Sequence, residues 1–316
     1  MNETFQHIDM QVDDPVEHAV LTGIWNSMRI VRQGQLEDSF AQGGVMQKED
    51  DTFVTRWDLR SEAVAAGVFA AMLPGVPFQS EEGTSTTGDN SGIRMGWDPL
   101  DGTRSKVVGS PNSTVIGTAY NADGSVYGAA IGEPATGRML SSFGPKGRVV
   151  GRIIADNGTH GEVQRTAPNV RVNKHPLTDR GQVFIDNNLP FRGKDGNTAF
   201  TLPQHLALRR SLALDNIGVL EVGSNGAHQL YVASGGDRAA AALTTARGIP
   251  EDTSAGLFLV ERAGGVVQRY TSLGGVALQR VVKESPEYNL ALAANSTETL
   301  LHLEKELFMT LERSVG

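Results

Sequence analysis

Hydrophobic positions in the first half of the chain recur at helical spacing and then in short runs. Around residues 18–32 and 58–73, apolar side chains return every three or four positions, which is typical of amphipathic helices. Pro74 and Gly75 mark the end of the second helix. Short apolar runs between turn residues follow and predict a meander. We expect strands at residues 76–80, 93–97, 115–120, 126–131 and 139–143, and loops at residues 42–54 and 84–92.

The second half of the chain alternates strands with helices, after a loop-rich stretch at residues 157–168. This order is typical of sheets that contain parallel strands. The predicted strands are residues 183–186, 218–222, 239–243, 266–269 and 290–294, and the predicted helices are residues 202–214, 227–234, 253–263 and 297–311. We therefore expect an α/β (α+β) protein. An antiparallel-sheet domain would occupy residues 1–150, and a mixed-sheet domain residues 151–316.

Composition narrows the functional classes. The 316 residues are 39% hydrophobic and 20% charged, which is ordinary for a soluble globular protein. A net charge of −8 gives no electrostatic footprint for a nucleic acid polymer or an anionic membrane. There is no cysteine, and we expect neither a signal peptide nor a membrane span. These features predict a cytoplasmic protein whose partner is a small molecule.

Carboxylates follow strand candidates at three places: Glu81, the pair Asp98 and Asp101, and Asp252. Such acids would repel one another unless a cation lies among them. Carboxylate oxygens suit a hard divalent ion, with Mg2+ the natural candidate and Mn2+ next, whereas zinc is disfavoured. Taken singly, each acid has an ordinary explanation, namely a solvated turn, surface charge or a helix N-cap.

The stretch WDPLDGT, residues 97–103, has the densest chemistry. Pro99 would bend the chain so that Asp98 and Asp101 point to one side, and Leu100 would offer its carbonyl oxygen. Gly102 lets the backbone approach a ligand closely. If a helix starts near Thr103, the free amides there form an anion cradle. The stretch therefore predicts a site for a metal and a phosphate together.

These segments resemble the inositol monophosphatase and fructose-1,6-bisphosphatase superfamily of metal-dependent, lithium-sensitive phosphatases. WDPLDGT is similar to its most specific motif, D-P-[LIV]-D-G-T. Four other segments are similar in the same order, and they are TFVTRWD (52–58), FQSEEG (78–83), GSNGAHQLYVASGGDRAA (223–240) and EDTSAGLFLVERAGGVV (251–267). The resemblance implies a layered αβαβα sandwich, a small phosphorylated metabolite as substrate, and a homodimer.

The resemblance also implies roles for matching positions. Two or three Mg2+ ions would be held by Glu81, Asp98, the Leu100 carbonyl, Asp101 and Asp252. Asp58 and Thr103 would orient the attacking water, with Glu81 as a further catalytic group. Substrate binding would involve Gly102, Thr103, Arg104, Ser224, Asn225 and Gly226. Hydrolysis of a phosphate monoester is the implied reaction.

Several positions depart from the family pattern. Glu251 replaces a usual Trp, and it either faces solvent or changes metal binding. Arg104 either contacts a second anionic group of the substrate or lies on a helix surface. No Glu stands near Thr244 and Thr245, where inositol-specific members carry one, which argues against inositol phosphate. Sugar, cyclitol, histidinol and nucleotide phosphates remain candidates, and substrate choice is expected from residues 157–216 as well as Ser224 to Gly226.

Two other functional classes stay open. The chain could be a catalytically inactive member of the family that binds a phosphorylated ligand. It could also be a structural module that uses its acids for Ca2+. A phosphate-release assay with Mg2+ separates both from the enzyme.

Overall fold

The computed structural model describes most of the chain. Described residues are 5–37, 45–48, 53–88, 92–103, 107, 110–145, 147–158, 160–186, 200–236, 238–245, 251–273, 277–281 and 288–312. The side chains of residues 251, 252 and 272–277 lie outside this description. Among the sequence-predicted site residues, Arg104 lies outside it altogether.

Helices and strands alternate irregularly along the chain. The helices are α1 (Pro15–Glu37), α2 (Arg56–Met72), α4 (Leu202–Leu214), α5 (Asn225–Ala233), α6 (Glu251–Arg262) and α7 (Thr297–Glu312). The strands of the first half are β1 (Ile8–Asp9), β2 (Val45–Gln47), β3 (Phe53–Thr55), β4 (Phe78–Ser80), β5 (Ser85–Thr86), β6 (Ile93–Asp101), β7 (Thr114–Asn121), β8 (Val126–Glu133) and β9 (Arg138–Phe143). Those of the second half are β10 (Val150–Asp156), β11 (Gly161–Ala167), β12 (Gln182–Ile185), β13 (Gly218–Leu220), β14 (Ala239–Thr245), β15 (Val266–Leu273), β16 (Ala277–Val281) and β17 (Leu290–Ala294).

Two large sheets organise the molecule. A nine-stranded sheet has the order β1-β11-β10-β9-β8-β7-β6-β4-β5, and its central strands β6 to β11 pair antiparallel. A six-stranded sheet has the order β13-β12-β14-β17-β15-β16. Strands β13, β12 and β14 are parallel and the remaining pairs are antiparallel, so this sheet is mixed as predicted.

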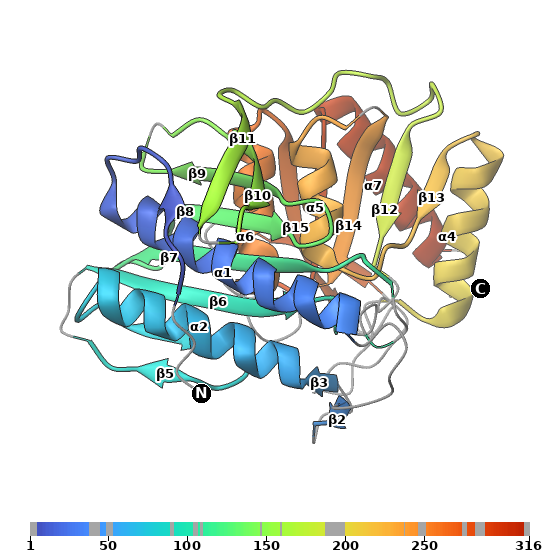
Figure 1. The fold of residues 1–316 in the computed structure, drawn as a ribbon. Helices are drawn as coiled ribbons and strands as arrows, with labels where there is room; N and C mark the ends of the chain where they lie inside the picture. The colour runs from blue at the N-terminus through green and yellow to red at the C-terminus, as the bar shows by residue number, and fades with distance from the viewer. Residues whose placement is uncertain are drawn as a thin grey trace.

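The elements stack in five layers, with α1 and α2 outside the first sheet, α5 and α6 between the sheets, and α4 and α7 outside the second (Figure 1). Three hydrophobic cores fill the gaps between these layers. Alternation along a strand divides its side chains between cores. On β12, Val183 and Ile185 enter the outer core while Phe184 enters the central one. The predicted αβαβα sandwich is confirmed.

Local signals explain where the site-bearing helix α2 begins. Thr55 is its N-cap and accepts from the backbone N–H groups of Trp57 and Asp58, while Asp58 accepts from the Thr55 N–H at 2.8 Å. This reciprocal capping box satisfies amides that the first helical turn leaves without partners. It also fixes the Asp58 carboxylate at the start of the helix.

Each of the three expected loops contains a strand. Residues 42–54 include β2 and part of β3, residues 84–92 include β5, and residues 157–168 include β11, so the loop predictions were wrong there. All three residues of β2 are exposed, and β11 is exposed at most positions. Such strands carry little apolar alternation, and backbone pairing stabilises them, β2 with β3 and β11 with β10 and β1. The boundary near residue 150 stays a prediction, and the two sheets change over between Ala167 and Gln182.

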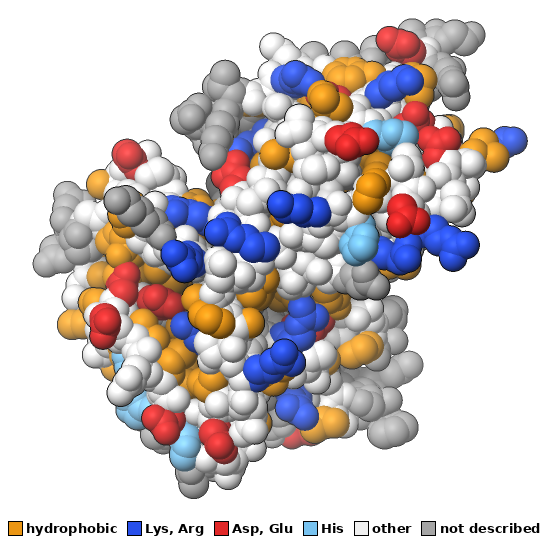
Figure 2. Space-filling model, turned by 90° about the horizontal axis from the view of Figure 1, so that it is seen from above, with side chains coloured by type: hydrophobic (Ala, Val, Ile, Leu, Met, Phe, Trp, Pro, Cys, Tyr) orange, Lys and Arg blue, Asp and Glu red, His pale blue; other side chains and the backbone are white. Residues whose placement is uncertain are grey.

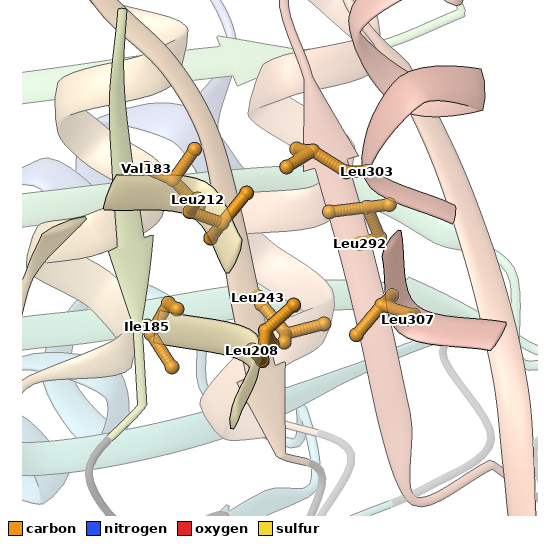
Figure 3. A pocket seen from close by; sticks show the side chains of 8 residues that line it. All are labelled: Val183, Ile185, Leu208, Leu212, Leu243, Leu292, Leu303 and Leu307. Carbon is orange, nitrogen blue, oxygen red and sulfur yellow. The ribbon is translucent and has the colours of Figure 1, made fainter. Parts of the chain in front are cut away.

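A small apolar cavity and the face shown in Figure 2 do not mark a site among the described residues. A small cavity between the second sheet and helices α4 and α7 is lined only by aliphatic side chains (Figure 3). On the face seen in Figure 2, acidic and basic side chains are interspersed. Within the part of the chain that is described, no helix is long and apolar enough to cross a membrane.

Candidate active site

An irregularity in β6 aims two carboxylates at the same side of the first sheet. Asp98 pairs with Ile116 of β7 and Asp101 pairs with Thr114, so three steps on β6 match two on β7. One extra residue on one strand is the signature of a β-bulge. It shifts the alternation of side chains between the two faces of the sheet, so that residues three apart on β6 point to the same face. Both acids therefore share the face of Ile116, which packs in the central core toward α5 and α6. The predicted bend at Pro99 is this bulge.

Glu81 is placed next to Asp98 by β4, the strand that pairs parallel with β6. β4 pairs parallel with β6, with Ser80 opposite Trp97, and the Glu81 N–H donates to the Trp97 carbonyl at 3.0 Å. Glu81 thus follows the carboxyl end of β4 next to Asp98. Functional groups collect at such strand ends in α/β folds. Trp97 itself is fully buried and packs edge-on against Phe69.

The N-terminus of α5 holds Asp101 from the opposite side. Asp101 Oδ2 accepts from the Gly226 N–H at 2.6 Å, the Ser224 hydroxyl at 2.7 Å and the Thr114 hydroxyl at 3.2 Å. Charge-assisted bonds at a helix N-terminus stabilise a carboxylate. Ser224 also caps α5 by accepting from the Ala227 N–H at 3.0 Å. The two predicted substrate residues Ser224 and Gly226 therefore position a predicted metal ligand in this structure.

Two glycines make this close approach possible. Gly102 has φ +92°, and an added Cβ would meet the Gly223 carbonyl and the Ser224 side chain, each at 3.0 Å. At Gly226 a Cβ would lie 2.3 Å from the Thr114 hydroxyl and 3.0 Å from Asp101 Oδ2. Only glycine fits either position without displacing the chain.

Helix α2 contributes the third side of the group. The Thr103 hydroxyl lies 3.1 Å from Asp58 Oδ1 and 3.1 Å from the Leu100 carbonyl, to which it can donate in turn. One turn along, the Ser61 hydroxyl donates to the Pro99 carbonyl at 2.9 Å. The buried Glu62 accepts from the Thr84 N–H at 2.7 Å. Thr103 itself has helical backbone, and residues 104–106, where the expected helix would continue, lie outside the described residues.

Burial sets the electrostatics of the site. It raises the pKa of Asp58 to about 6, although bonds from Thr55 and Thr103 oppose the shift. Burial likewise raises the pKa of Asp101 to about 6, against the bonds from Gly226 and Ser224. In both cases the Glu81 charge raises the pKa further, which shows that this carboxylate acts on the whole group. Such shifts are common where carboxylates serve a function.

Lys48 and Glu82 also lie in this region, although they were not predicted as site residues. Lys48 Nζ lies 3.5 Å from Glu81 and 2.8 Å from Glu82, whose side chain is only 4% exposed. Burial raises the pKa of Glu82 to about 7. Burial disfavours the charged Lys48, but Glu82 and Glu81 outweigh that effect and raise its pKa. No local pattern pointed to Lys48, because its partners are 33 and 34 residues away.

The structure therefore brings together most of the predicted residues. The residues that lie on connected elements around the bulge of β6 are Asp58, Glu81, Asp98, the Leu100 carbonyl, Asp101, Gly102 and Thr103. Asp252 and Glu251 begin α6, but their side chains are outside the described residues. The Asn225 side chain donates to the Thr245 carbonyl at 3.2 Å.

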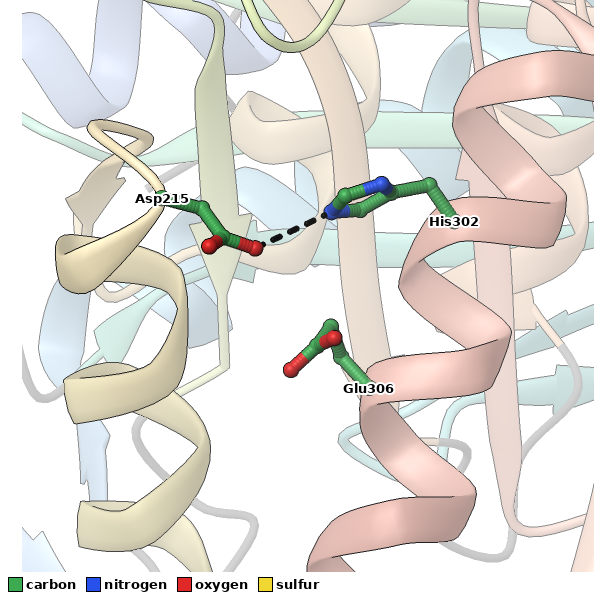
Figure 4. A group of neighbouring side chains, drawn as sticks. All are labelled: Asp215, His302 and Glu306. Atoms are coloured by element: carbon green, nitrogen blue, oxygen red, sulfur yellow. Dashed lines mark ion pairs between the residues drawn. The ribbon is translucent and has the colours of Figure 1, made fainter.

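A second, separate acidic group lies between α4 and α7 (Figure 4). The donor atoms of Asp215, His302 and Glu306 all lie within 4.8 Å of one another, close enough to hold a metal ion. Across the described residues, the oxygens of Glu81, Asp98 and Asp101 are spaced more widely than this. Lys48 and the α5 N-terminus draw Glu81 and Asp101 toward different sides. The Asp215 group was not predicted from the sequence.

The donor set around β6 suits a hard divalent cation. It offers carboxylate oxygens and a backbone carbonyl, with neither a sulfur nor an imidazole ligand in the predicted set. The Asp58–Thr103 pair beside it has a hydroxyl whose proton is directed to an acceptor. Its oxygen is left to accept a hydrogen bond from a water molecule. Chemically, the arrangement can bind a cation and orient a water next to it.

Comparisons with known proteins agree on one family. The model of the inositol monophosphatase family matches residues 13–302. The suhB extragenic suppressor protein of Bartonella henselae is 19% identical, with TM-score 0.69 over 93% of this chain and 98% of that one. The Thermotoga maritima IMPase is 17% identical, with TM-score 0.65 over 91% and 96% of the two chains. Mycobacterium tuberculosis SuhB is 17% identical, with TM-score 0.65 over 95% and 98%. No curated protein matches the sequence.

Proposed function

This chain belongs to the inositol monophosphatase family, and on that premise we propose that it is a metal-dependent phosphatase. Its substrate would be a phosphate monoester of a small polar metabolite, such as a sugar, cyclitol, histidinol or nucleotide phosphate. The observation that carries the proposal is the bulge of β6. It turns Asp98 and Asp101 to one face, with Glu81 on the adjacent strand.

We propose that the cation is Mg2+, with Mn2+ possible, bound as two or three ions. Glu81, Asp98, the Leu100 carbonyl, Asp101 and Asp252 would hold it. When bound, it would lower the pKa of water and neutralise phosphate charge. The raised pKa values of Asp58 and Asp101 support a cation here, because uncompensated carboxylates are costly in a buried setting.

The chain's own residues would orient the water. Thr103 donates its hydroxyl proton to Asp58 Oδ1 or to the Leu100 carbonyl. Its oxygen is then free to accept a hydrogen bond that the attacking water donates. That water then turns a lone pair toward the phosphate. The capping box holds Asp58 in place through Thr55, and orientation of this kind lowers the barrier to attack. Glu81 would share this role next to Asp98.

Inositol phosphate is disfavoured as the substrate. Near Thr244 and Thr245, where inositol-specific members carry a Glu, this chain has none, and the Thr245 hydroxyl donates to Asp186. We further propose a cytoplasmic homodimer, as the family resemblance implies. Light scattering on the purified chain tests the dimer.

A panel of phosphate esters tests the function. The purified protein is assayed for phosphate release with Mg2+ and, as a control, with EDTA, while calorimetry follows Mg2+ binding. We expect Mg2+-dependent release from at least one ester and inhibition by Li+. Metal binding without release from any ester would instead identify a binding protein that does not turn its ligand over. Stabilisation by Ca2+ alone would identify a structural calcium module.

A further inference from the structure

Asp215, His302 and Glu306 bring an imidazole and two carboxylates together between α4 and α7 (Figure 4). His302 and Glu306 are four residues apart on α7, so both project from one face of that helix. Asp215 faces them from the C-cap of α4. The three donor atoms lie within 4.8 Å of one another. None of these residues belongs to the group around the bulge of β6.

The Nε2 atom of His302 is buried and aimed at Asp215 without forming a hydrogen bond to it. It lies 3.5 Å from Asp215 Oδ2, and among the described residues nothing hydrogen-bonds to it. An N–H···O bond normally spans about 2.7–3.2 Å. Two ligands that bind a tetrahedral ion at about 2.0–2.1 Å stand about 3.3 Å apart. The spacing of Asp215 and His302 therefore fits two ligands of one metal ion better than a direct hydrogen bond.

Glu306 is held in position by a neighbouring hydroxyl group. Its side chain is buried, and Ser211 donates to its Oε2 atom at 2.5 Å. Hydrogen bonds of this kind orient carboxylates that bind metals. Asp215 is the most exposed of the three residues, so rotation of its side chain can bring its oxygen closer to Glu306. One fixed and one adjustable carboxylate thus flank the imidazole.

The electrostatic surroundings favour a cation. Asp215 lies at the C-terminal end of α4, where the helix dipole is negative, and the last turn of this helix contains no basic residue. Asp215 and Glu306 also repel each other unless a cation lies between them. An imidazole combined with carboxylates suits Zn2+ and its neighbours in the first transition row, whereas Mg2+ prefers oxygen ligands alone.

We propose that Asp215, His302 and Glu306 form a structural site for one divalent transition-metal ion of the Zn2+ type, and that this ion clips α7 to α4. The inference is independent of the proposed function, because the site shares no residue with the group that would bind Mg2+. Three protein ligands leave the remaining coordination position to water.

The packing beneath the site shows what the clip stabilises. A small apolar cavity lies between the second sheet and the two helices, so their contact is incomplete there (Figure 3). His302 and Glu306 each precede a leucine of α7 that lines this cavity, Leu303 and Leu307. The metal ion adds a bond between α4 and α7 at the place where apolar packing is least complete.

Calorimetric titration with Zn2+ tests the site. Mg2+ is kept in large excess to compete at the carboxylates around β6, and the titration compares the wild type, His302→Gln and His160→Gln. The His160 ring contacts Asn157 in the turn between β10 and β11, so His160→Gln is the matched control for loss of a histidine. We expect the wild type and the control to bind one Zn2+ per chain, and His302→Gln to bind it at least about tenfold more weakly.

Thermal melting tests the structural role. Only the folded chain brings the three donors together, so Zn2+ at about a hundredfold excess over its Kd should raise the wild-type Tm by about 4 °C. His302→Gln should show no such rise. Phosphate release measured with Mg2+ should be the same in both proteins, because the site lies outside the candidate active site.

Two results would overturn the inference. Absence of Zn2+ binding to the wild type would leave Asp215 and His302 as an ion pair only. Unchanged affinity in His302→Gln would place the bound Zn2+ elsewhere. Should His302→Gln fail to fold, Asp215→Asn decides the question, because this side chain is 45% exposed, and it should weaken Zn2+ binding while Mg2+ binding stays. None of these readouts requires phosphate release, so failure of the site and failure of the proposed function are distinguishable.

Discussion

Two acidic groups in this protein differ in the elements that hold them. Asp215, His302 and Glu306 have donor atoms that converge tightly, but they sit between two helices, where the Asp215 and His302 side chains are 45% and 31% exposed. Asp215 pairs with His302 at 3.5 Å, and Ser211 donates to Glu306 at 2.5 Å. This group has its own internal partners.

The group of Glu81, Asp98 and Asp101 converges less tightly but is held by strand ends, a bulge and a helix N-terminus. It also adjoins a hydroxyl–carboxylate pair that can orient water. Under the proposed function, a frame that fixes several donors beside a reactive neighbour is a stronger sign of a catalytic site than the proximity of donor atoms. Rigid backbone elements are what hold a catalytic arrangement in place.

The largest effect is expected from Asp101→Asn. The amide oxygen can still accept from Gly226 and Ser224, so the fold should survive and the melting temperature should change little. Loss of a carboxylate that would hold the cation removes several kcal/mol of transition-state stabilisation, or about a thousandfold in kcat. Phosphate release and thermal melting of the same preparation measure both. Activity retained near the wild-type value would contradict the assignment of Asp101.

The free energy of unfolding is expected to depend on pH through the buried His228 of α5. Its folded pKa of about 4 lies below the ordinary value of 6.5, so the stability that it contributes is present above pH 6.5 and falls as the pH drops toward 4. The loss amounts to about 3 kcal/mol at pH 4. Urea unfolding at pH 7 and pH 4 should show this loss in the wild type. In His228→Gln that component should be missing, and an identical pH dependence in the variant would contradict it.

Gly226→Ala tests the closeness of α5 to Asp101. The added Cβ would lie 2.3 Å from the Thr114 hydroxyl, and overpacking of this kind costs about 2 kcal/mol. Displacement of Asp101 should also lower kcat/KM about tenfold. Gly67→Ala is the matched control, because nothing lies within 4 Å of its added Cβ on α2. It should raise stability by up to about 1 kcal/mol and leave activity unchanged.

The smallest effect is expected at the other acidic group. Asp215→Asn removes one exposed charge at the C-cap of α4 and weakens an exposed pair with His302. Such pairs contribute about 0–1 kcal/mol. Phosphatase activity should be unchanged, and a large loss of activity would move the functional centre to this group.

Sequence reasoning succeeded where the signal was local. Glu81 follows β4 as predicted, whereas Asp98 and Asp101 lie within the last residues of β6, which is longer than predicted. Helical periodicity located α2, α4 and α7 within a few residues. The start of α2 was also readable, because Thr55 and Asp58 have the spacing of a capping box. These features depend on neighbours within one turn or one strand.

Contacts that join distant segments were not predictable. Ser224 and Gly226 reach Asp101 across 123 and 125 residues, and Asp186 reaches Thr245 across 59. Strand β11 also pairs with the distant β1, which its own mostly exposed residues do not reveal. Such contacts depend on the packing of layers rather than on local propensity.

Calorimetric titration with Mg2+ tests the central claim most directly, because it asks which of the two groups binds the cation. The titration compares the wild type with Asp101→Asn and Asp215→Asn, all three shown by melting curves to be folded. We predict that Asp101→Asn weakens Mg2+ binding at least about tenfold while Asp215→Asn binds like the wild type. Wild-type affinity in Asp101→Asn, with loss of binding in Asp215→Asn, would contradict the account.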